Sequence, residues 1–375
     1  MMSKTLSRRN LLKLGTAGIV GALLPGRSAF GLTQPTYAAS RRNNEDEPKG
    51  YGLALAGGTL VRAEPNINAK KVRALKRDDV VAIFDQMETK SGSAYNKLWY
   101  QVEDGYIHSA NLLEVPNTSG NIALPEAGEH GFWVELTVPY FDVRGGAGMN
   151  AGRSKYRYYG GTVYKVKEVL KADNVPEESK LLFGAIDETW YQLDDEQFPG
   201  RYFVPASYMR VITEDEIAPI SEEVDARDKT ITVDLKEQRV YCYEKGKEVF
   251  TARCASGRNY NGGNFQTPKG EHFSYRKTPS QHMWGGAVGD DGSFDLPGIP
   301  WVTYFVTTGV AFHGTYWHND YGQPRSHGCV NLTSENSKWI FRWTRPVHDP
   351  APKNWYTSVA WRKPNPDEIT VVKVV

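Results

Sequence analysis

The stretch Ala311-Phe312-His313-Gly314-Thr315, followed by Arg325-Ser326-His327-Gly328-Cys329-Val330-Asn331-Leu332, decides what fold and chemistry to expect of this chain. It places an imidazole sixteen positions before Cys329, one of only three cysteines among 375 residues. A thiolate is a good nucleophile, and a nearby imidazole takes its proton and lowers its pKa from about 8.5 to roughly 3.5–7.5. The spacing therefore predicts acyl transfer through a thioester, with Cys329 as nucleophile and His313 as base.

The glycine between His327 and Cys329 supports the same prediction. Because glycine has no Cβ, the backbone can turn sharply and approach a ligand closely. Successive N–H groups of His327, Gly328 and Cys329 would then point at one spot, as an oxyanion hole requires.

Two other interpretations compete with catalysis. A lone cysteine is most often a small buried apolar residue. His313, His327 and Cys329 are also three candidate ligands for zinc with one open position. No paired His-x-x-x-His or Cys-x-x-Cys spacing accompanies them, so the sequence favours a site without metal or cofactor.

The same residues resemble the signature of the L,D-transpeptidase (YkuD-type) catalytic domain: His313-Gly314-Thr315 and then Ser326-His327-Gly328-Cys329-Val330-Asn331. The resemblance extends over roughly 227–349, with a looser tail that takes the expected catalytic domain to 227–375, and Thr267-Pro268-Lys269-Gly270 is similar to the family's Thr-Pro-x-Gly turn. It implies a mostly β catalytic fold, Cys329 as nucleophile, His313 as base and His327 as a pocket residue. Gly314 replaces a serine found in some members, and its carbonyl is still expected to orient the imidazole.

The resemblance also implies the substrate. The family attacks peptidoglycan stem peptides at the bond before a terminal D-alanine and passes the acyl group to an amine, giving 3-3 cross-links. The expected role is therefore in cell-wall biogenesis and cell shape. Two alternatives remain: an L,D-carboxypeptidase, in which water resolves the thioester, and a non-catalytic wall-binding protein.

Four further residues near the motif are candidates for contacts with substrate. Arg325 is near enough to hold a carboxylate, or it is an ordinary structural arginine. Asn331 is expected to brace the turn after the nucleophile through bonds to the backbone. Trp301 and Tyr304 either line the donor groove or pack in the core.

His282, Met283 and Trp284 lie between glycine-rich turns and are candidates for a lid.

Residues 1–39 predict export by the twin-arginine pathway. Ser7-Arg8-Arg9-Asn10-Leu11-Leu12-Lys13 resembles the twin-arginine signature, and the apolar run that follows is shorter than the ~20 residues that span a bilayer. These residues hold five of the 45 bases and no acid, so the remainder has 40 bases against 44 acids. That balance favours no nucleic acid or polybasic membrane contact. The expected location is the cell wall, periplasm or extracytoplasmic face.

An internal repeat organises the middle of the chain beyond a polar linker at 40–49. Leu98-Trp99-Tyr100-Gln101-Val102-Glu103-Asp104 recurs as Thr189-Trp190-Tyr191-Gln192-Leu193-Asp194-Asp195. Short alternating strands surround both copies. Each unit resembles a bacterial SH3-like module, the second one less closely because of an insertion at 194–199. The expected domains are 50–116 and 125–215, and the aromatic residues either bind wall polymer or form the core.

The catalytic part is expected to be a β-rich domain with one short helix at 334–343, for which Ser334 is the expected N-cap. Strands at 357–361 and 370–374 would close its sheet. Cys242 and Cys254 are placed on two arms of a hairpin that turns near Lys245-Gly246. Their offset exceeds the reach of a disulfide, so both are predicted to be free thiols.

Overall fold

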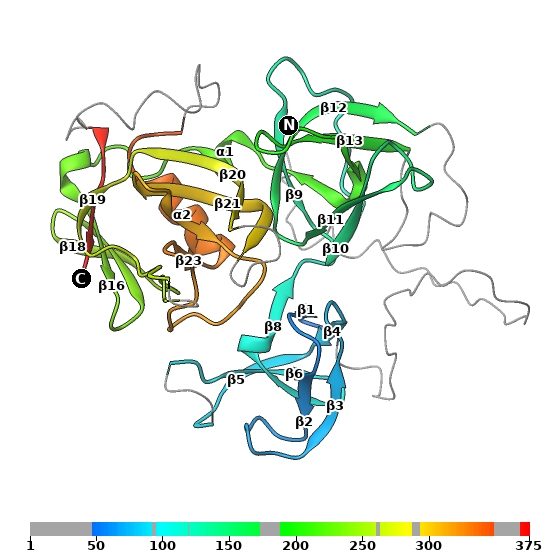
Figure 1. Cartoon of the computed structure of the whole chain (residues 1–375), viewed down its shortest axis with the longest axis horizontal. Helices are drawn as coiled ribbons and strands as arrows, with labels where there is room; N and C mark the ends of the chain where they lie inside the picture. The colour runs from blue at the N-terminus through cyan, green and yellow to red at the C-terminus, as the bar shows by residue number, and fades with distance from the viewer. Residues whose placement is uncertain are drawn as a thin grey trace, which may run out of the picture. The chain divides into compact units, whose positions relative to one another are not determined.

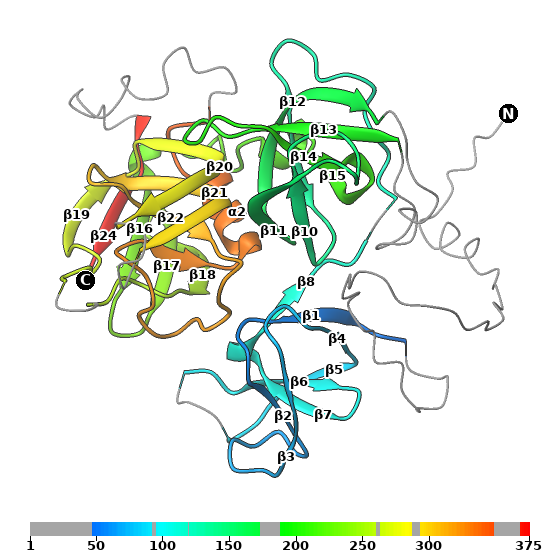
Figure 2. The same cartoon turned by 45° about the vertical axis from the view of Figure 1, so that its right-hand side comes forward.

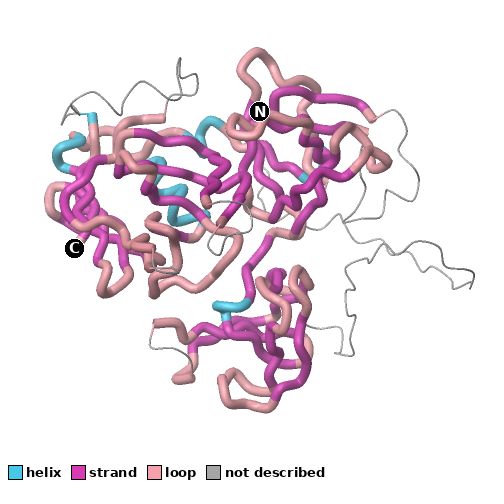
Figure 3. Tube along the Cα trace, in the orientation of Figure 1, coloured by secondary structure: helices cyan, strands magenta, loops and turns pink. Residues whose placement is uncertain are grey.

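The computed structural model describes residues 47–91, 95–118, 120–172, 188–259, 263–286, 293–348 and 368–375, and the prediction of a mostly β protein is confirmed (Figures 1 and 3). The described strands form five sheets. The export segment, most of the polar linker and the strand expected at 357–361 lie outside the described residues. Within the described residues, no helix is long and apolar enough to cross a membrane.

The first β unit is built from two sheets that share one core. One sheet has the order β4-β1-β8 and the other the order β3-β2-β7-β6-β5. Alternating side chains from both sheets are fully buried, as period-two patterning requires. The strands are β1 (Gly50–Ala54), β2 (Thr59–Arg62), β3 (Lys71–Leu75), β4 (Val80–Ile83), β5 (Asp85–Glu88), β6 (Leu98–Val102), β7 (Gly105–His108) and β8 (Leu112–Val115).

The second β unit is one seven-stranded sheet in the order β11-β10-β14-β13-β12-β9-β15. Its core is unusually aromatic, with Tyr158 stacked on Tyr164 at 4.1 Å and Phe141 packed edge-on against Trp190. The strands are β9 (Phe132–Leu136), β10 (Tyr140–Arg144), β11 (Arg153–Tyr159), β12 (Val163–Lys171), β13 (Thr189–Asp194), β14 (Tyr202–Pro205) and β15 (Met209–Val211).

The internal repeat corresponds to a repeated order of elements. In the first copy β6 and β7 precede a 3-10 helix (Ser109–Asn111) and β8, and in the second β13 and β14 precede a 3-10 helix (Ala206–Tyr208) and β15. The repeated Trp-Tyr pairs, Trp99-Tyr100 and Trp190-Tyr191, are buried. Of the two roles open to these aromatic residues, the structure supports the core, since a buried ring offers no stacking surface. The similarity to SH3-like modules stays a prediction.

The C-terminal part holds two sheets with a helix packed against one of them (Figure 2). A short helix α1 (Glu214–Ile217) leads into it. One sheet has the order β18-β17-β16-β24-β19, from β16 (Lys229–Asp234), β17 (Arg239–Glu244), β18 (Lys247–Arg253), β19 (Gly270–Phe273) and β24 (Val371–Val374). The other has the order β20-β21-β22-β23, from β20 (Arg276–Gly285), β21 (Phe294–Val306), β22 (Val310–Gly314) and β23 (Val330–Leu332).

The hairpin of β17 and β18 confirms the prediction for the cysteines. Lys245 and Gly246 both have positive φ, which suits a tight two-residue turn. Cys242 faces Phe250 rather than 249, because a bulge after Cys242 shifts the register by one residue. Cys242 and Cys254 are free and buried, and burial raises the pKa of both thiols. Neither is therefore poised to act as a nucleophile.

The helix α2 (Ser334–Trp343) has the predicted bounds, but its N-cap is Thr333, not Ser334. The Thr333 hydroxyl accepts the N–H of Asn336 at 3.2 Å, which satisfies one of the unpaired amides of the first turn. The buried face of α2 places Ile340 and Trp343 in the same core as strands β16, β22 and β23. This packing fixes the two strands that carry the motif residues.

Candidate catalytic site

Two neighbouring parallel strands bring the motif residues together. β22 pairs with β23 so that His313 lies beside Asn331, and Cys329 comes just before β23. Because side chains alternate along a strand, Cys329 and Asn331 point to the same face of the sheet. His313 and Cys329 both line one cavity of about 750 Å³. The structure therefore gathers the two halves of the motif at one site.

His313 has the orientation of a general base. Its Nδ1 donates to the carbonyl oxygen of Gly314 at 2.9 Å, as the sequence predicted, which leaves Nε2 as the acceptor. A Cβ at position 314 would lie 2.8 Å from Pro300 and 3.0 Å from Ser337 Oγ, so the glycine gives α2 room to approach. Burial lowers the pKa of His313 to about 4. The ring is therefore neutral near pH 7.

The resting state of Cys329 differs from the predicted thiolate paired with His313. Sγ donates to the carbonyl oxygen of Gly309 at 3.8 Å. Burial raises the pKa of the Cys329 thiol to about 11, and a backbone hydrogen bond from Ala311 offsets this only in part. The low-dielectric surroundings disfavour the charged form of both groups, so the thiol and the imidazole that line this cavity are both neutral at rest.

Ser326 holds the turn that precedes Cys329. Its hydroxyl donates to the carbonyl oxygen of Cys329 at 2.5 Å and accepts the N–H of Gly328 at 3.1 Å. Gly328 has φ +119, which requires glycine, and Gly257 packs directly behind it, where a Cβ would lie 2.7 Å from the Gly328 Cα. The predicted oxyanion donor at Gly328 is thus occupied by Ser326 in this state.

His327 and Arg325 both line the cavity, but His327 packs against aromatic rings and Arg325 forms an ion pair. The His327 ring packs against Phe265 and Phe294, with centroids 5.0 and 5.3 Å away, and burial lowers its pKa. Arg325 forms an ion pair with the buried carboxylate of Asp320, at 3.0 Å through Nε. That pairing supports the structural interpretation of Arg325 over the substrate-binding one.

The two aromatic candidates, Tyr304 and Trp301, differ in whether they line the cavity. Tyr304 lines the cavity, and the Arg276 guanidinium lies 5.1 Å from its ring centroid. Trp301 does not line it and is buried, so of the two roles open to this residue the structure supports the core. Its backbone has φ +57, and its buried ring packs on Phe341 of α2 at 5.4 Å.

Asn331 also has a different partner from the one predicted. Its side-chain amide lies 2.9 Å from Nε2 of His318, so the bond goes to a ring and not to the backbone. His318 is buried, and burial lowers its pKa to about 3. Because Asn331 pairs with His313 across β22 and β23, its bond to His318 stabilises the sheet next to His313.

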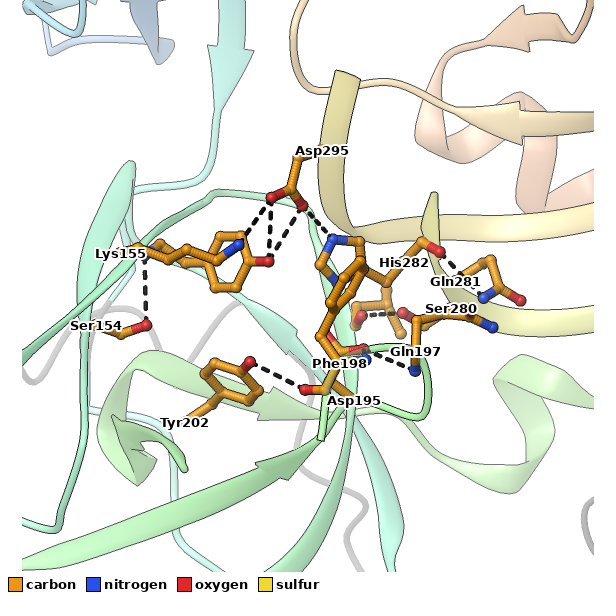
Figure 4. Close-up of polar contacts among 12 residues, drawn as sticks. Ser154, Lys155, Asp195, Gln197, Phe198, Tyr202, Ser280, Gln281, His282 and Asp295 are labelled. Atoms are coloured by element: carbon orange, nitrogen blue, oxygen red, sulfur yellow. Dashed lines mark hydrogen bonds and ion pairs between the residues drawn. The ribbon is translucent and has the colours of Figure 1, made fainter. Parts of the chain in front are cut away.

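Sequence reasoning missed one part of the cavity wall altogether. Gln197, from the insertion between β13 and β14 of the second β unit, lines the cavity together with His282, Met283 and Trp284 of β20. Figure 4 shows this insertion against β20, joined by polar contacts around His282. The insertion and the expected lid were each recognised in the sequence, but no local signal connects them.

The fold and the cavity thus define a β-sheet domain whose cleft holds a cysteine and a buried histidine. Residues 228–359 match the family model of the L,D-transpeptidase catalytic domain (YkuD). This part of the chain therefore belongs to the L,D-transpeptidase family of catalytic domains. A comparison with curated proteins gave no match.

Solved structures similar to the chain include further L,D-transpeptidases. One from Mycobacterium smegmatis is 19% identical with a TM-score of 0.30, and the match covers 40% of this chain and 58% of that protein. The catalytic domain of the Enterococcus faecium L,D-transpeptidase is 22% identical with a TM-score of 0.28, covering 40% of this chain and 98% of that domain. L,D-transpeptidase 3 from Mycobacterium tuberculosis, in complex with a faropenem-derived adduct, is 15% identical with a TM-score of 0.29, covering 50% and 74%. The chain thus spans 58% of the length of the first of these relatives.

Proposed function

We propose that the chain is an exported peptidoglycan L,D-transpeptidase that cross-links stem peptides through a thioester on Cys329. The observation that carries the proposal is the single cavity that both Cys329 and His313 line, with the imidazole fixed by Gly314 so that Nε2 is free to accept a proton. A thiol and an imidazole suffice for this chemistry, and no cofactor is invoked.

The proposed reaction begins from the neutral pair. Nε2 of His313 takes the thiol proton as Sγ attacks the carbonyl carbon of the donor peptide. Backbone N–H groups of the turn stabilise the oxyanion, the Cys329 amide directly and the Gly328 amide once the Ser326 hydroxyl turns away. The C–N bond then breaks, His313 gives its proton to the leaving D-alanine amine, and a thioester remains.

The second half resolves the thioester. His313 takes a proton from the incoming amine of another stem, the amine attacks the carbonyl, and the proton returns to Sγ as the C–S bond breaks. Water in place of the amine gives the carboxypeptidase reaction with the same residues. The outcome depends on how the acceptor side of the cavity excludes water.

The charge of the cavity wall supports an anionic substrate. Among the described residues that line it are two arginines, Arg276 and Arg325, and no carboxylate. Arg325 forms an ion pair with Asp320, and Arg276 donates to the side-chain carbonyl of Gln281 at 3.1 Å and lies over the ring of Tyr304. A guanidinium in this position favours the carboxylates of a stem peptide.

The decisive experiment incubates the full chain with disaccharide tetrapeptides and follows the products by mass spectrometry. Cross-linked dimers with release of D-alanine support transpeptidation, tripeptides indicate hydrolysis, and no change with retained wall binding indicates a scaffold. Cys329→Ala should abolish turnover, while Cys254→Ala serves as the matched cysteine control. Alkylation should inactivate the chain and chelation should not. Wild-type turnover by Cys329→Ala would refute the assignment of the nucleophile.

Export by the twin-arginine pathway and binding of wall polymer by the N-terminal units belong to the same proposal. An export assay with Arg8 and Arg9 replaced by lysine tests the first. A peptidoglycan pull-down with the full chain tests the second, for which the buried Trp-Tyr pairs are excluded as binding residues.

A further inference from the structure

The insertion of the second β unit is held against β20 by a histidine between two carboxylates. Nδ1 of His282 lies 2.5 Å from Oδ2 of Asp195, and Nε2 lies 2.5 Å from Oδ1 of Asp295 in β21 (Figure 4). His282 is 3% exposed in its side chain and Asp195 is 7% exposed. Each ring nitrogen of His282 thus faces a carboxylate, and hydrogen bonds to carboxylates are charge-assisted; the Asp195 end of the bridge is buried and the Asp295 end is 43% exposed.

Two neighbouring groups extend the bridge. Lys155 and the hydroxyl of Tyr156, both from β11, lie 3.1 and 3.2 Å from the Asp295 carboxylate. The ring of Phe198 packs on His282 at 4.5 Å and approaches Trp284 at 6.0 Å. The insertion therefore contacts β20 through both charge and apolar surface.

The local backbone of the insertion is set by the same carboxylate. Oδ1 of Asp195 accepts the N–H groups of Gln197 and Phe198 at 3.1 and 3.0 Å, which closes a tight turn. One oxygen of Asp195 thus shapes the turn while the other binds His282. Because Asp195 makes both contacts, Gln197 is held at the wall of the cavity that Cys329 and His313 line.

On β20, a register irregularity makes the contact possible. The pairing of β20 with β21 shifts between Gln281 and Met283, so His282 leaves the regular alternation at this point. Bulges re-aim side chains in this way and are frequent beside active sites. His282 can then reach Asp195 while Met283 and Trp284 continue to line the cavity.

We propose that the turn Asp195–Pro199 of the insertion is a working part of the substrate-binding wall and that Gln197 is a specificity-determining residue for the stem peptide. A carboxamide donates and accepts hydrogen bonds in one plane and therefore matches a peptide unit of the donor or acceptor stem. Asp195 and His282 act as positioning residues, since they touch the wall and not the reacting atoms. This inference depends on the proposed transpeptidase function and adds a substrate contact from outside the catalytic domain.

The test compares Gln197→Ala with Gln86→Ala, an exposed glutamine of β5 in the first unit. Steady-state kinetics on disaccharide tetrapeptide should show KM raised about three- to tenfold for Gln197→Ala, the range expected for one lost hydrogen bond, with kcat little changed. Gln86→Ala should match the unaltered chain. The rate at which iodoacetamide alkylates Cys329 should be the same in all three, because this small reagent makes no contact with the wall.

The bridge is tested with Asp195→Ala, Asp195→Asn and the neighbouring Asp194→Ala. Asp194 pairs with Lys167 at the surface and makes a matched control. Asp195→Ala should raise KM as Gln197→Ala does, Asp195→Asn should recover most of the loss by restoring the turn, and Asp194→Ala should have no effect. The double variant Asp195→Ala with Gln197→Ala should lose less than the product of the two single effects.

Three results would overturn the inference. Gln197→Ala could have the same KM as Gln86→Ala, Asp195→Ala could lower turnover while Gln197→Ala does not, or the variants could slow alkylation of Cys329 as much as turnover. No turnover by the unaltered chain on any stem peptide would instead refute the proposed function, and this inference with it.

Discussion

At the scale of single residues, burial determines the chemistry of the site more than charge pairing does. It raises the pKa of Cys329 to about 11 and lowers that of His313 to about 4, so each group is neutral at rest. In the proposed mechanism the Cys329 thiol is activated during attack, when substrate displaces water and the proton moves to Nε2 of His313. Such a site protects its thiol from reagents that require a standing thiolate.

This leads to a prediction about pH. The alkylation rate of Cys329 in the free chain should keep rising from pH 7 towards about 11, because the thiolate fraction grows throughout this range. Turnover, for which His313 is the proposed base, should instead be flat near neutral pH and fall only as pH approaches about 4, where the imidazole gains its proton. Mass spectrometry of labelled peptides and initial rates measure the two profiles.

The contrary result would be an alkylation plateau reached below pH 8, the mark of a stable thiolate–imidazolium pair. Cys242 and Cys254 provide internal controls. Both are buried, so neither should be labelled in the folded chain. Denaturant added to a parallel sample should expose all three thiols.

Gly314 provides a second prediction at this scale. Gly314→Ser keeps the carbonyl that binds His313 but adds a Cβ 2.8 Å from Pro300 and 3.0 Å from the Ser334 Cα. Overpacking of this kind costs about 1–3 kcal/mol, so the urea midpoint should fall. Gly50→Ser, with nothing within 4 Å of the added Cβ, is the control for the change of residue type. Equal midpoints for the two variants would show that α2 yields without cost.

At the scale of elements, α2 depends on a buried lysine at its C-terminal end. Nζ of Lys277 in β20 donates to the carbonyl oxygens of Phe341 and, at 2.7 Å, Thr344. These are carbonyl groups that the helix itself leaves unpaired. Burial holds the pKa of Lys277 well below its usual value, and a neutral amine still has two hydrogens for two acceptors.

Lys277→Met should therefore lower the free energy of unfolding by about 1–3 kcal/mol, since it keeps the apolar stem and leaves two buried carbonyls unpaired. Lys247→Met in β18, where the lysine is exposed, is the matched control. In the unaltered chain, Lys277 is less protonated in the folded state than in the unfolded state. The free energy of unfolding should therefore rise with pH over the range in which this lysine stays protonated only in the unfolded chain. Urea titrations at several pH values check both statements. A Lys277→Met variant as stable as Lys247→Met would contradict this role.

How far sequence predicts these elements depends on the range of the forces involved. The bounds of α2 follow from local periodicity, and the turn at Lys245-Gly246 follows from local backbone preference. The bulge beside Cys242 and the positive φ of Trp301 do not, because tertiary packing imposes them. The motif predicted which residues line the cavity, but burial, which sets the protonation of Cys329, is a property of the folded core.

At the scale of the whole molecule, the second β unit contributes Gln197 to the cavity that Cys329 and His313 line. The bond between Asp195 and His282 joins residues 87 positions apart, a distance at which no local sequence pattern operates. A second contact lies nearby, where Gly298 of β21 meets Tyr164 of β12. Gly298 has φ +68, and a Cβ there would lie 2.4 Å from the Tyr164 ring. The close approach of the Tyr164 ring to the backbone of β21 at this point depends on glycine.

Gly298→Ala should therefore disturb the junction in two ways, through the unfavourable φ and through the collision with a buried ring. The φ alone costs about 1–2 kcal/mol, and Gly246→Ala, with φ +78 and open space around it, isolates that cost. The collision should add about 1–3 kcal/mol and raise KM for stem peptide, since the cavity wall moves with the junction. Urea unfolding followed by tryptophan fluorescence, together with the tetrapeptide assay, measures both effects.

Combining Gly298→Ala with Tyr164→Ala should cost less than the two single changes together, because the smaller residue removes the collision. If Gly298→Ala cost no more than Gly246→Ala and left KM unchanged, the second β unit would not be coupled to the cavity through this contact.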